Sequence, residues 1–130
     1  MFLDTTVLIE ILQENAESIR FKEIYKHIED DILFISIIQL AEVSDWCLRE
    51  KLDVEECVVD ITEFANVIPL SNAICLEGSK IKFEMRYQGA KKFSLIDGLI
   101  LASARAVDQK LLTTDSDFRK ADDAILLKKH

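Results

Sequence analysis

The chain has 130 residues, of which 49% are hydrophobic and 31% are charged, and both figures are typical of one soluble globular domain. We therefore predict a single domain over residues 1–130. Its 24 acidic and 16 basic side chains give a net charge of −8, which argues against broad electrostatic attraction to nucleic acid. The apolar runs are too short to span a bilayer, and the N-terminus lacks the basic region that opens a signal peptide. We expect a cytoplasmic protein that does not contact a membrane.

Several common types of site are excluded. Cys47, Cys57 and Cys75 are odd in number and match neither a disulfide framework nor a metal knuckle, so we predict small buried thiols in a reducing compartment. His27, inside a predicted helix, and His130, the last residue, do not suit a zinc site or a catalytic triad. No phosphate-binding glycine motif occurs.

In chain order, the sequence begins with a short apolar strand at residues 1–3, and Asp4 follows it directly. Apolar residues spaced by three and four positions, from Phe21 to Ile28, then predict a helix. Residues 32–36 are an apolar run of strand length. Three pairs spaced by three residues have the form of a capping box and predict the starts of helices. These pairs are Ser36 with Gln39, Asp53 with Glu56, and Ser94 with Asp97.

The second half of the chain continues this alternation. Residues 67–70 form a third predicted strand, and Ser71 is expected to cap a long helix that stops at Gly89. Residues 111–114 form a fourth strand, and residues 124–128 a fifth at the edge of the sheet. The buried face of the long helix should consist of Ile74, Gly78, Ile81 and Met85.

Strands that alternate with helices predict an α/β fold with a mainly parallel sheet of four to five strands, covered on both faces. The carboxyl ends of parallel strands lie along one edge of the sheet, which is where such folds bind ligands. Asp4 directly follows the first predicted strand, and Asp115 directly follows the fourth. We therefore expect these two carboxylates to share that edge.

Four acidic residues, Asp4, Glu42, Asp97 and Asp115, occur at the strand-exit side of the predicted elements. Each has a structural alternative, because the three aspartates could cap helices and Glu42 could lie on a solvated helix face. Carboxylates gathered at one edge repel one another unless a cation neutralises them. Mg²⁺ and Mn²⁺ suit such a site, since both prefer oxygen ligands and leave positions for water and phosphate. We therefore predict metal-dependent phosphodiester hydrolysis, which needs no side-chain nucleophile.

One basic stretch covers residues 80–93, with five basic residues against one acid and with Phe83, Tyr87 and Phe93 between them. It could follow the phosphates of a nucleic acid and stack its bases beside the metal. Alternatively, it is a solvated helix face whose aromatic rings pack in the core or against a dimer partner. The candidates for RNA contact are Arg86, Lys91 and Lys92.

Four segments resemble, in order, the motifs of the PIN-domain ribonucleases, and within them the small stand-alone VapC toxins of toxin–antitoxin modules. The segments are FLDTTVL (2–8), ISIIQLAEV (35–43), SLIDGLILASA (94–104) and LLTTDSDF (111–118). Any one motif is weakly specific, but four in order at suitable spacing are quite specific. The resemblance covers essentially the whole chain.

The resemblance implies an α/β/α sandwich and a catalytic site in which Asp4, Glu42, Asp97 and Asp115 bind Mg²⁺ or Mn²⁺. Within this set we expect the first three to hold the principal ion, and Asp115 to help position that ion, the attacking water or a second ion. The resemblance further implies a homodimer that cleaves RNA and is silenced by an antitoxin whose tail fills the active site. The accessory residues would be Thr6, Thr113 and Asp117.

Two alternatives to the toxin remain. One is an RNA-processing PIN nuclease that acts without an antitoxin, which the sequence does not separate from a toxin. The other is a non-catalytic PIN-like scaffold for protein interaction. The presence of all four acids argues against the scaffold.

Overall fold

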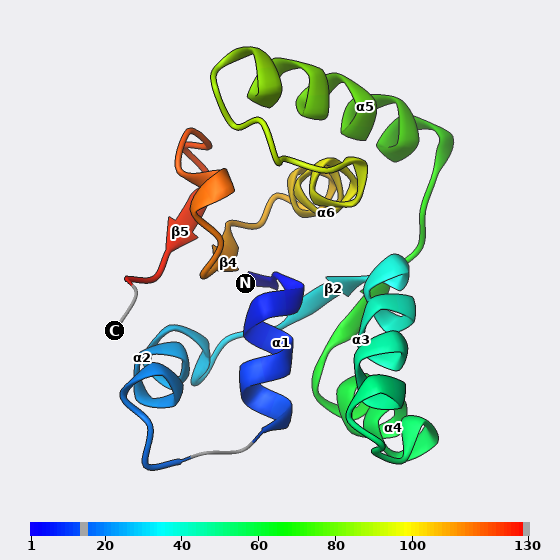
Figure 1. The fold of residues 1–130 in the computed structure, drawn as a ribbon, viewed down its shortest axis with the longest axis vertical. Helices are drawn as coiled ribbons and strands as arrows, with labels where there is room; N and C mark the ends of the chain where they lie inside the picture. The colour runs from blue at the N-terminus through cyan, green and yellow to red at the C-terminus, as the bar shows by residue number, and fades with distance from the viewer. Residues whose placement is uncertain (14–15, 129–130) are drawn as a thin grey trace.

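The computed structural model describes residues 1–13 and 16–128, and its elements alternate as predicted (Figure 1). None of the helices in this part of the chain is long and apolar enough to cross a membrane. The elements are β1 (Phe2–Leu3), α1 (Thr5–Leu12), α2 (Ile19–Ile28), β2 (Phe34–Ser36), α3 (Ile37–Arg49), α4 (Val54–Phe64), β3 (Asn66–Ile68), α5 (Asn72–Tyr87), α6 (Leu95–Ala106), β4 (Leu111–Thr113), the 3-10 helix η1 (Ser116–Phe118) and β5 (Ala124–Leu126).

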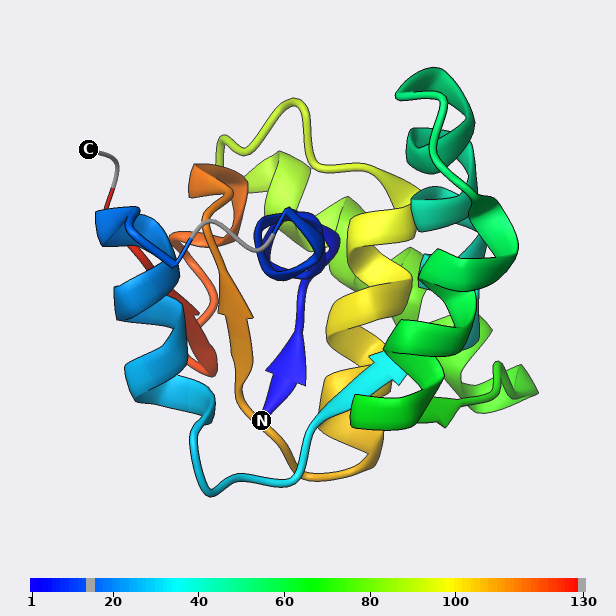
Figure 2. The same cartoon turned by 90° about the horizontal axis from the view of Figure 1, so that it is seen from below.

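The five strands form one sheet in the order β3-β2-β1-β4-β5, and every neighbouring pair is parallel. The first strand is central, with Phe2 opposite Phe34 on one side and Leu111 on the other. Figure 2 shows β1 and β4 side by side and pointing the same way, with α1 beginning at the tip of β1. The predicted parallel sheet and the fifth strand at its edge are confirmed.

Successive side chains of the strands face opposite layers of helices. Phe2 and Leu111 belong to the core under α5 and α6, whereas Leu3 and Leu112 belong to the core under α1 to α4. Figure 1 shows these two groups of helices on opposite sides of the sheet. The protein is therefore a three-layer α/β/α sandwich, as predicted.

Local capping signals fix where the helices begin. The capping boxes of Ser36 with Gln39 and of Ser94 with Asp97 are both formed, and Ser71 caps α5. The buried side of α5 is confirmed as predicted. It consists of Ile74, Gly78, Ile81 and Met85.

The two helices of one layer touch through their backbones. A Cβ atom added to Gly98 of α6 would collide with the carbonyl oxygen of Gly78 in α5. The glycines therefore permit a close crossing that a larger side chain would prevent. Because Gly98 follows Asp97, this crossing also helps to fix the first turn of α6, which carries that acid.

Some predicted details are wrong. The second strand begins at Phe34 because Ile32 is exposed, and the third ends at Ile68, before Pro69, which has no N–H to donate to a neighbouring strand. The predicted burial of all three cysteines holds for Cys47, but Cys57 is only half-buried and Cys75 is exposed on α5. Hydrophobicity alone does not tell which face of a helix a small side chain occupies.

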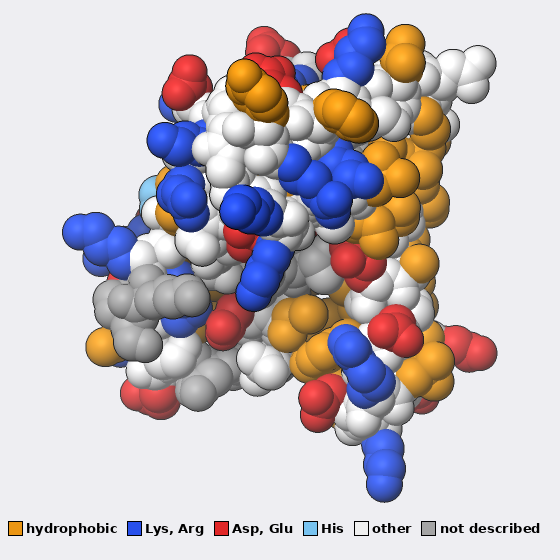
Figure 3. Space-filling model, turned by 45° about the horizontal axis from the view of Figure 1, so that its top comes forward, with side chains coloured by type: hydrophobic (Ala, Val, Ile, Leu, Met, Phe, Trp, Pro, Cys, Tyr) orange, Lys and Arg blue, Asp and Glu red, His pale blue; other side chains and the backbone are white. Residues whose placement is uncertain are grey.

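The predicted basic stretch lies on α5 and on the loop that leads to α6, where Lys and Arg side chains gather on the surface (Figure 3). Phe83 and Tyr87 are 82% and 93% exposed. Phe93 is fully buried, with its ring 5.2 Å from that of Phe118 in an edge-to-face arrangement. The interpretation of Phe93 as a base-stacking residue is therefore wrong, because Phe93 packs in the core.

Candidate active site

A pocket of about 590 Å³ lies at the edge of the sheet where the strands end. All four predicted acids line it, although they come from distant parts of the sequence. Asp4 directly follows β1, and Asp115 lies two residues after the end of β4. Glu42 lies on α3, and Asp97 lies in the first turn of α6. The parallel sheet brings these positions together because the carboxyl ends of its strands share one edge.

Two threonine hydroxyls orient the carboxylate of Asp4. Its Oδ2 atom accepts hydrogen bonds from Thr113 Oγ1 at 2.6 Å and from Thr6 Oγ1 at 3.0 Å. Asp4 occupies the position before α1, yet its side chain makes no capping hydrogen bond to that helix. Asp4 is thus the N-cap residue of α1 by position, but its carboxylate is held by the hydroxyls of Thr6 in α1 and Thr113 in β4.

Burial makes Asp4 a costly negative charge. The residue is 3% exposed, and the pKa of its carboxyl is raised to about 6, chiefly by burial. The nearby charge of Asp97 contributes to this rise, whereas the hydrogen bonds from Thr113 and Thr6 oppose it. A cation or a proton close to Asp4 would therefore stabilise the folded protein.

A second hydrogen-bond chain holds Glu42. Thr5 donates from Oγ1 to Glu42 Oε1 at 2.6 Å, and Gln39 donates from Nε2 to Thr5 Oγ1 at 3.2 Å and to the carbonyl of Leu3 at 2.8 Å. Burial raises the pKa of Glu42, and so does Asp97, while the bond from Thr5 lowers it. Glu42 is half-buried, so the alternative of a simply solvated face does not hold.

Sequence reasoning missed the role of Thr5. The signal that the sequence offers is the position of Thr5 beside Asp4 in the segment DTT. Glu42, the partner of Thr5, lies 37 positions further along the chain, so no local pattern connects the two residues.

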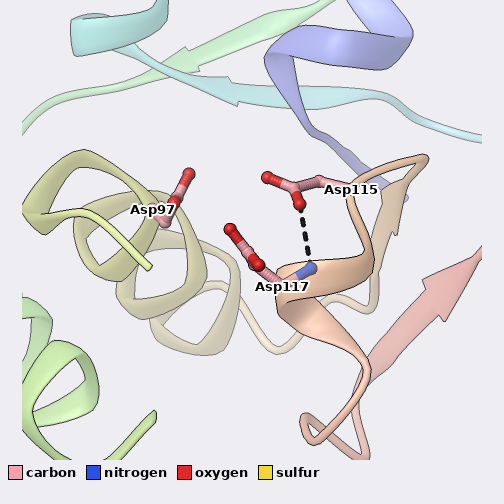
Figure 4. Close-up of side chains that lie close together, drawn as sticks. All are labelled: Asp97, Asp115 and Asp117. Atoms are coloured by element: carbon pink, nitrogen blue, oxygen red, sulfur yellow. Dashed lines mark hydrogen bonds between the residues drawn. The ribbon is translucent and has the colours of Figure 1, made fainter. Parts of the chain in front are cut away.

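Three carboxylates from α6 and η1 lie close together (Figure 4). One oxygen each of Asp97, Asp115 and Asp117 fall within 4.8 Å of one another. Asp97 Oδ2 accepts from Ser94 N at 2.9 Å, and Asp115 Oδ1 accepts from Asp117 N at 2.9 Å. Burial raises the pKa of Asp97, and so do the charges of the other two aspartates. Helix capping and membership of the acidic cluster are thus compatible, because one side chain does both.

The two predicted accessory threonines connect the ends of β1 and β4. Thr113 Oγ1 donates to Asp4 and accepts from Asp115 N at 3.0 Å. Thr6 Oγ1 also donates to Asp4 and accepts from Thr114 N at 3.3 Å. These bonds tie the backbone after β4 to the carboxylate after β1, so the two strand ends position each other's acids.

The predicted RNA-contact residues lie outside the residues that line this pocket. Lys91 and Lys92 are exposed in the loop between α5 and α6. Arg86 donates from Nε to the carbonyl of Phe93 at 2.7 Å and so fastens this loop to the end of α5. Arg86 therefore has a structural task in addition to the predicted contact with RNA.

Three further residues on α3 line the pocket and were missed. Asp45, Trp46 and Arg49 lie three, four and seven positions after Glu42, so they continue along the same face of the helix. This spacing is the signal that could have identified them. Among the residues that line the pocket, Arg49 is the basic one, against five carboxylates.

Comparisons with known proteins agree with this arrangement. A toxin–antitoxin complex from Klebsiella pneumoniae is structurally similar at a TM-score of 0.72 and 20% identity, covering 95% of this chain and 94% of that one. VapBC2 from Rickettsia felis, bound to a DNA fragment from its promoter, is similar at a TM-score of 0.72 and 18% identity. The similarity covers 97% of this chain and 96% of that one. VapBC-1 from nontypeable Haemophilus influenzae is similar at a TM-score of 0.69 and 23% identity, covering 97% of this chain and 95% of that one.

No functionally curated protein matches the chain in sequence. The sequence model of the PIN domain, however, matches residues 1–124. With the parallel sheet and the four acids at its edge, this match completes the assignment, and the chain belongs to the PIN-domain family.

Proposed function

We propose that this protein is a metal-dependent endoribonuclease and the toxin of a toxin–antitoxin pair. The observation that carries the proposal is the gathering of Asp4, Glu42, Asp97 and Asp115 in one pocket of a PIN domain. Five carboxylates that line one pocket with Arg49 as its basic lining residue are a poor arrangement for stability alone. They are a good arrangement for a cation that acts on phosphate.

The donor set fits Mg²⁺ or Mn²⁺. It consists of carboxylate oxygens, which these hard cations prefer, and it offers no sulfur or imidazole among the residues lining the pocket. The raised pKa values of Asp4, Glu42 and Asp97 show mutual repulsion and burial, both of which a cation would offset. When bound, such a cation polarises a phosphodiester and makes water a better nucleophile at neutral pH.

Within this site, we assign the four acids to metal binding and catalysis, with Asp117 as a close fifth contributor. The 4.8 Å cluster favours a position between Asp97, Asp115 and Asp117, and Asp4 and Glu42 line the same pocket within electrostatic reach of Asp97. The hydrogen bonds to these carboxylates hold them in place before a ligand arrives, which reduces the cost of organising the site.

RNA must approach a negative pocket on a protein of net charge −8. Neutralisation by the cation removes much of the repulsion, and exposed Lys91 and Lys92 can attract phosphates from the neighbouring loop. Arg86 can contribute through the guanidinium nitrogens that do not bond to Phe93. Binding should therefore depend on both the divalent cation and the salt concentration.

The proposed partners follow from the structural relatives. Two of these are described as VapBC proteins and one as a toxin–antitoxin complex, so we propose an antitoxin that binds this chain in the cytoplasm. We also propose a homodimer. The exposed Phe83 and Tyr87 on α5 offer apolar area for a protein contact.

Cleavage of a mixed pool of labelled single-stranded RNAs tests the proposal. Purified protein is assayed with Mg²⁺, with Mn²⁺ and with EDTA, beside Asp97→Asn and a control variant, Asp60→Asn, which changes an exposed acid of α4 outside the pocket. We expect cleavage that requires the metal, is lost in Asp97→Asn and is kept in Asp60→Asn. Cleavage that persists in EDTA or in Asp97→Asn would contradict the proposal.

A further inference from the structure

The only tryptophan of the chain, Trp46, forms part of the wall of the acidic pocket. It lies on α3, one helical turn after Glu42. The residue is half-buried, and part of its surface packs against the core between the sheet and helices α1 to α4. An indole ring that is supported by the core and also borders a pocket is a rigid surface against which a flat ligand can stack.

The surroundings of Trp46 differ from the acidic part of the pocket. Ile9 and Ile96 supply apolar lining, and Arg49 follows Trp46 by three residues on the same helix. The ion pair of Arg49 with Asp45 is long, at 3.8 Å, and both side chains are mostly exposed, so it holds the guanidinium only weakly. The pocket thus joins the proposed metal-binding region to a region with an aromatic ring, apolar side chains and an exposed positive charge.

These features match one nucleotide of a single strand. Bases stack on aromatic side chains with about 1–3 kcal/mol each, and arginine binds phosphate through its planar set of N–H groups. A pocket of about 590 Å³ is in the size range that holds a small organic ligand. A base inside a duplex is already stacked on its neighbours, so it cannot reach the ring without unpairing.

We propose that Trp46 stacks on an unpaired base next to the scissile phosphate and that Arg49 binds a neighbouring phosphate. This proposal rests on the proposed function, because it assigns substrate-binding roles to two residues of the same pocket. Trp46 and Arg49 are then specificity-determining residues, and the acids remain the catalytic ones. The position of the base relative to the acids also selects which phosphate is cut.

The single tryptophan makes the proposal directly measurable. The fluorescence of Trp46 is recorded in the Asp97→Asn protein, so that RNA binds without being cut. The buffer contains Mg²⁺ at a concentration that saturates the weaker metal site expected of this variant, because Mn²⁺ is paramagnetic and quenches emission. Short oligoadenylate and oligouridylate strands and a blunt RNA duplex serve as probes. We expect saturable quenching by the single strands and little or none by the duplex.

Variants separate stacking from packing. We expect Trp46→Ala to weaken the binding of labelled single strands by roughly tenfold or more, and Trp46→Phe, which keeps an aromatic ring, to lose much less. Arg49→Gln should weaken binding and make it less dependent on salt, whereas Arg49→Lys should retain part of both. Leu48→Ala changes an exposed neighbour outside the pocket and serves as the control. Thermal unfolding of each variant shows whether it is folded.

The outcomes distinguish this proposal from the function on which it rests. If wild-type protein cleaves RNA but single strands leave the emission of Trp46 unchanged, the stacking proposal is wrong and the nuclease proposal stands. Equal quenching by duplex and single strands also refutes it. If no RNA is bound or cut by folded protein with either metal, both proposals fail. If Trp46→Ala does not fold, the stacking proposal is still tested by the fluorescence titration and by the RNA affinity of Trp46→Phe.

Discussion

Replacing Asp4 by asparagine should stabilise the metal-free protein at neutral pH. Burial raises the pKa of Asp4 from 3.8 to about 6, so the folded protein holds this proton more tightly than the unfolded chain does. The free energy of unfolding therefore falls as the pH rises from about 4 to about 6 and stays low above that range. At about 1.4 kcal/mol for each pH unit between the two values, the ionised carboxylate costs the fold on the order of 3 kcal/mol.

The assay is urea denaturation of wild-type protein and Asp4→Asn in EDTA, at pH 4 and at pH 7. Altered hydrogen bonds to Thr113 and Thr6 affect the variant at both pH values, so the informative quantity is how much the difference changes between them. We expect the variant to gain roughly 2.4 kcal/mol on the wild type from pH 4 to pH 7, since part of the cost is already present at pH 4. A difference that stays constant would refute the reasoning.

Asp123 provides a control of opposite sign. Its hydrogen bond to Arg105 lowers the pKa of Asp123, so its contribution to stability is present at neutral pH and is lost as the pH falls. Because that loss lies below the ordinary pKa of 3.8, Asp123→Asn should differ from the wild type by nearly the same amount at pH 4 and at pH 7, unlike Asp4→Asn. Mg²⁺ should in turn raise the free energy of unfolding of the wild type more than that of Asp4→Asn, because the variant lacks one of the carboxylates that we assign to the metal.

Three further substitutions have defined outcomes. Asp97→Asn should lose RNA cleavage yet unfold at the same or a higher temperature, because the amide oxygen can still accept from Ser94 N; a variant that cuts at the wild-type rate would remove Asp97 from the site. Thr113→Val should cost about 1–3 kcal/mol in urea denaturation, since two buried groups lose a partner, whereas Thr113→Ser should cost much less. Gly98→Ala should lower the unfolding midpoint, because the new methyl group collides with the backbone of α5, and an unchanged midpoint would contradict that close crossing.

Most of the fold could be predicted because its signals are local. The pairs Ser36 with Gln39 and Ser94 with Asp97 are three residues apart, so the sequence alone indicates where their helices begin. The apolar strands are short, and the helices between them require parallel neighbours, which leaves few arrangements of the sheet. Because Asp4 directly follows a strand, its place at the carboxyl edge followed from that sheet.

The remaining details depend on contacts across the sequence. The hydrogen bond of Thr5 to Glu42 requires that α1 and α3 lie side by side, which no local pattern encodes. Phe93 and Tyr87 occur in one basic stretch, yet the first is buried against Phe118 and the second is exposed, because the loop turns inward after α5. The exposure of Cys75 is likewise set by the way in which its helix packs.

The most direct test of the central claim, that the acidic pocket binds the cation used for RNA cleavage, is a calorimetric titration of the metal-free protein with Mn²⁺ at pH 7. The wild type is compared with Asp97→Asn and with Asp60→Asn. We predict saturable binding by the wild type and the control, and binding at least roughly tenfold weaker by Asp97→Asn. Equal affinity in all three proteins, or no binding by the wild type, would contradict the account.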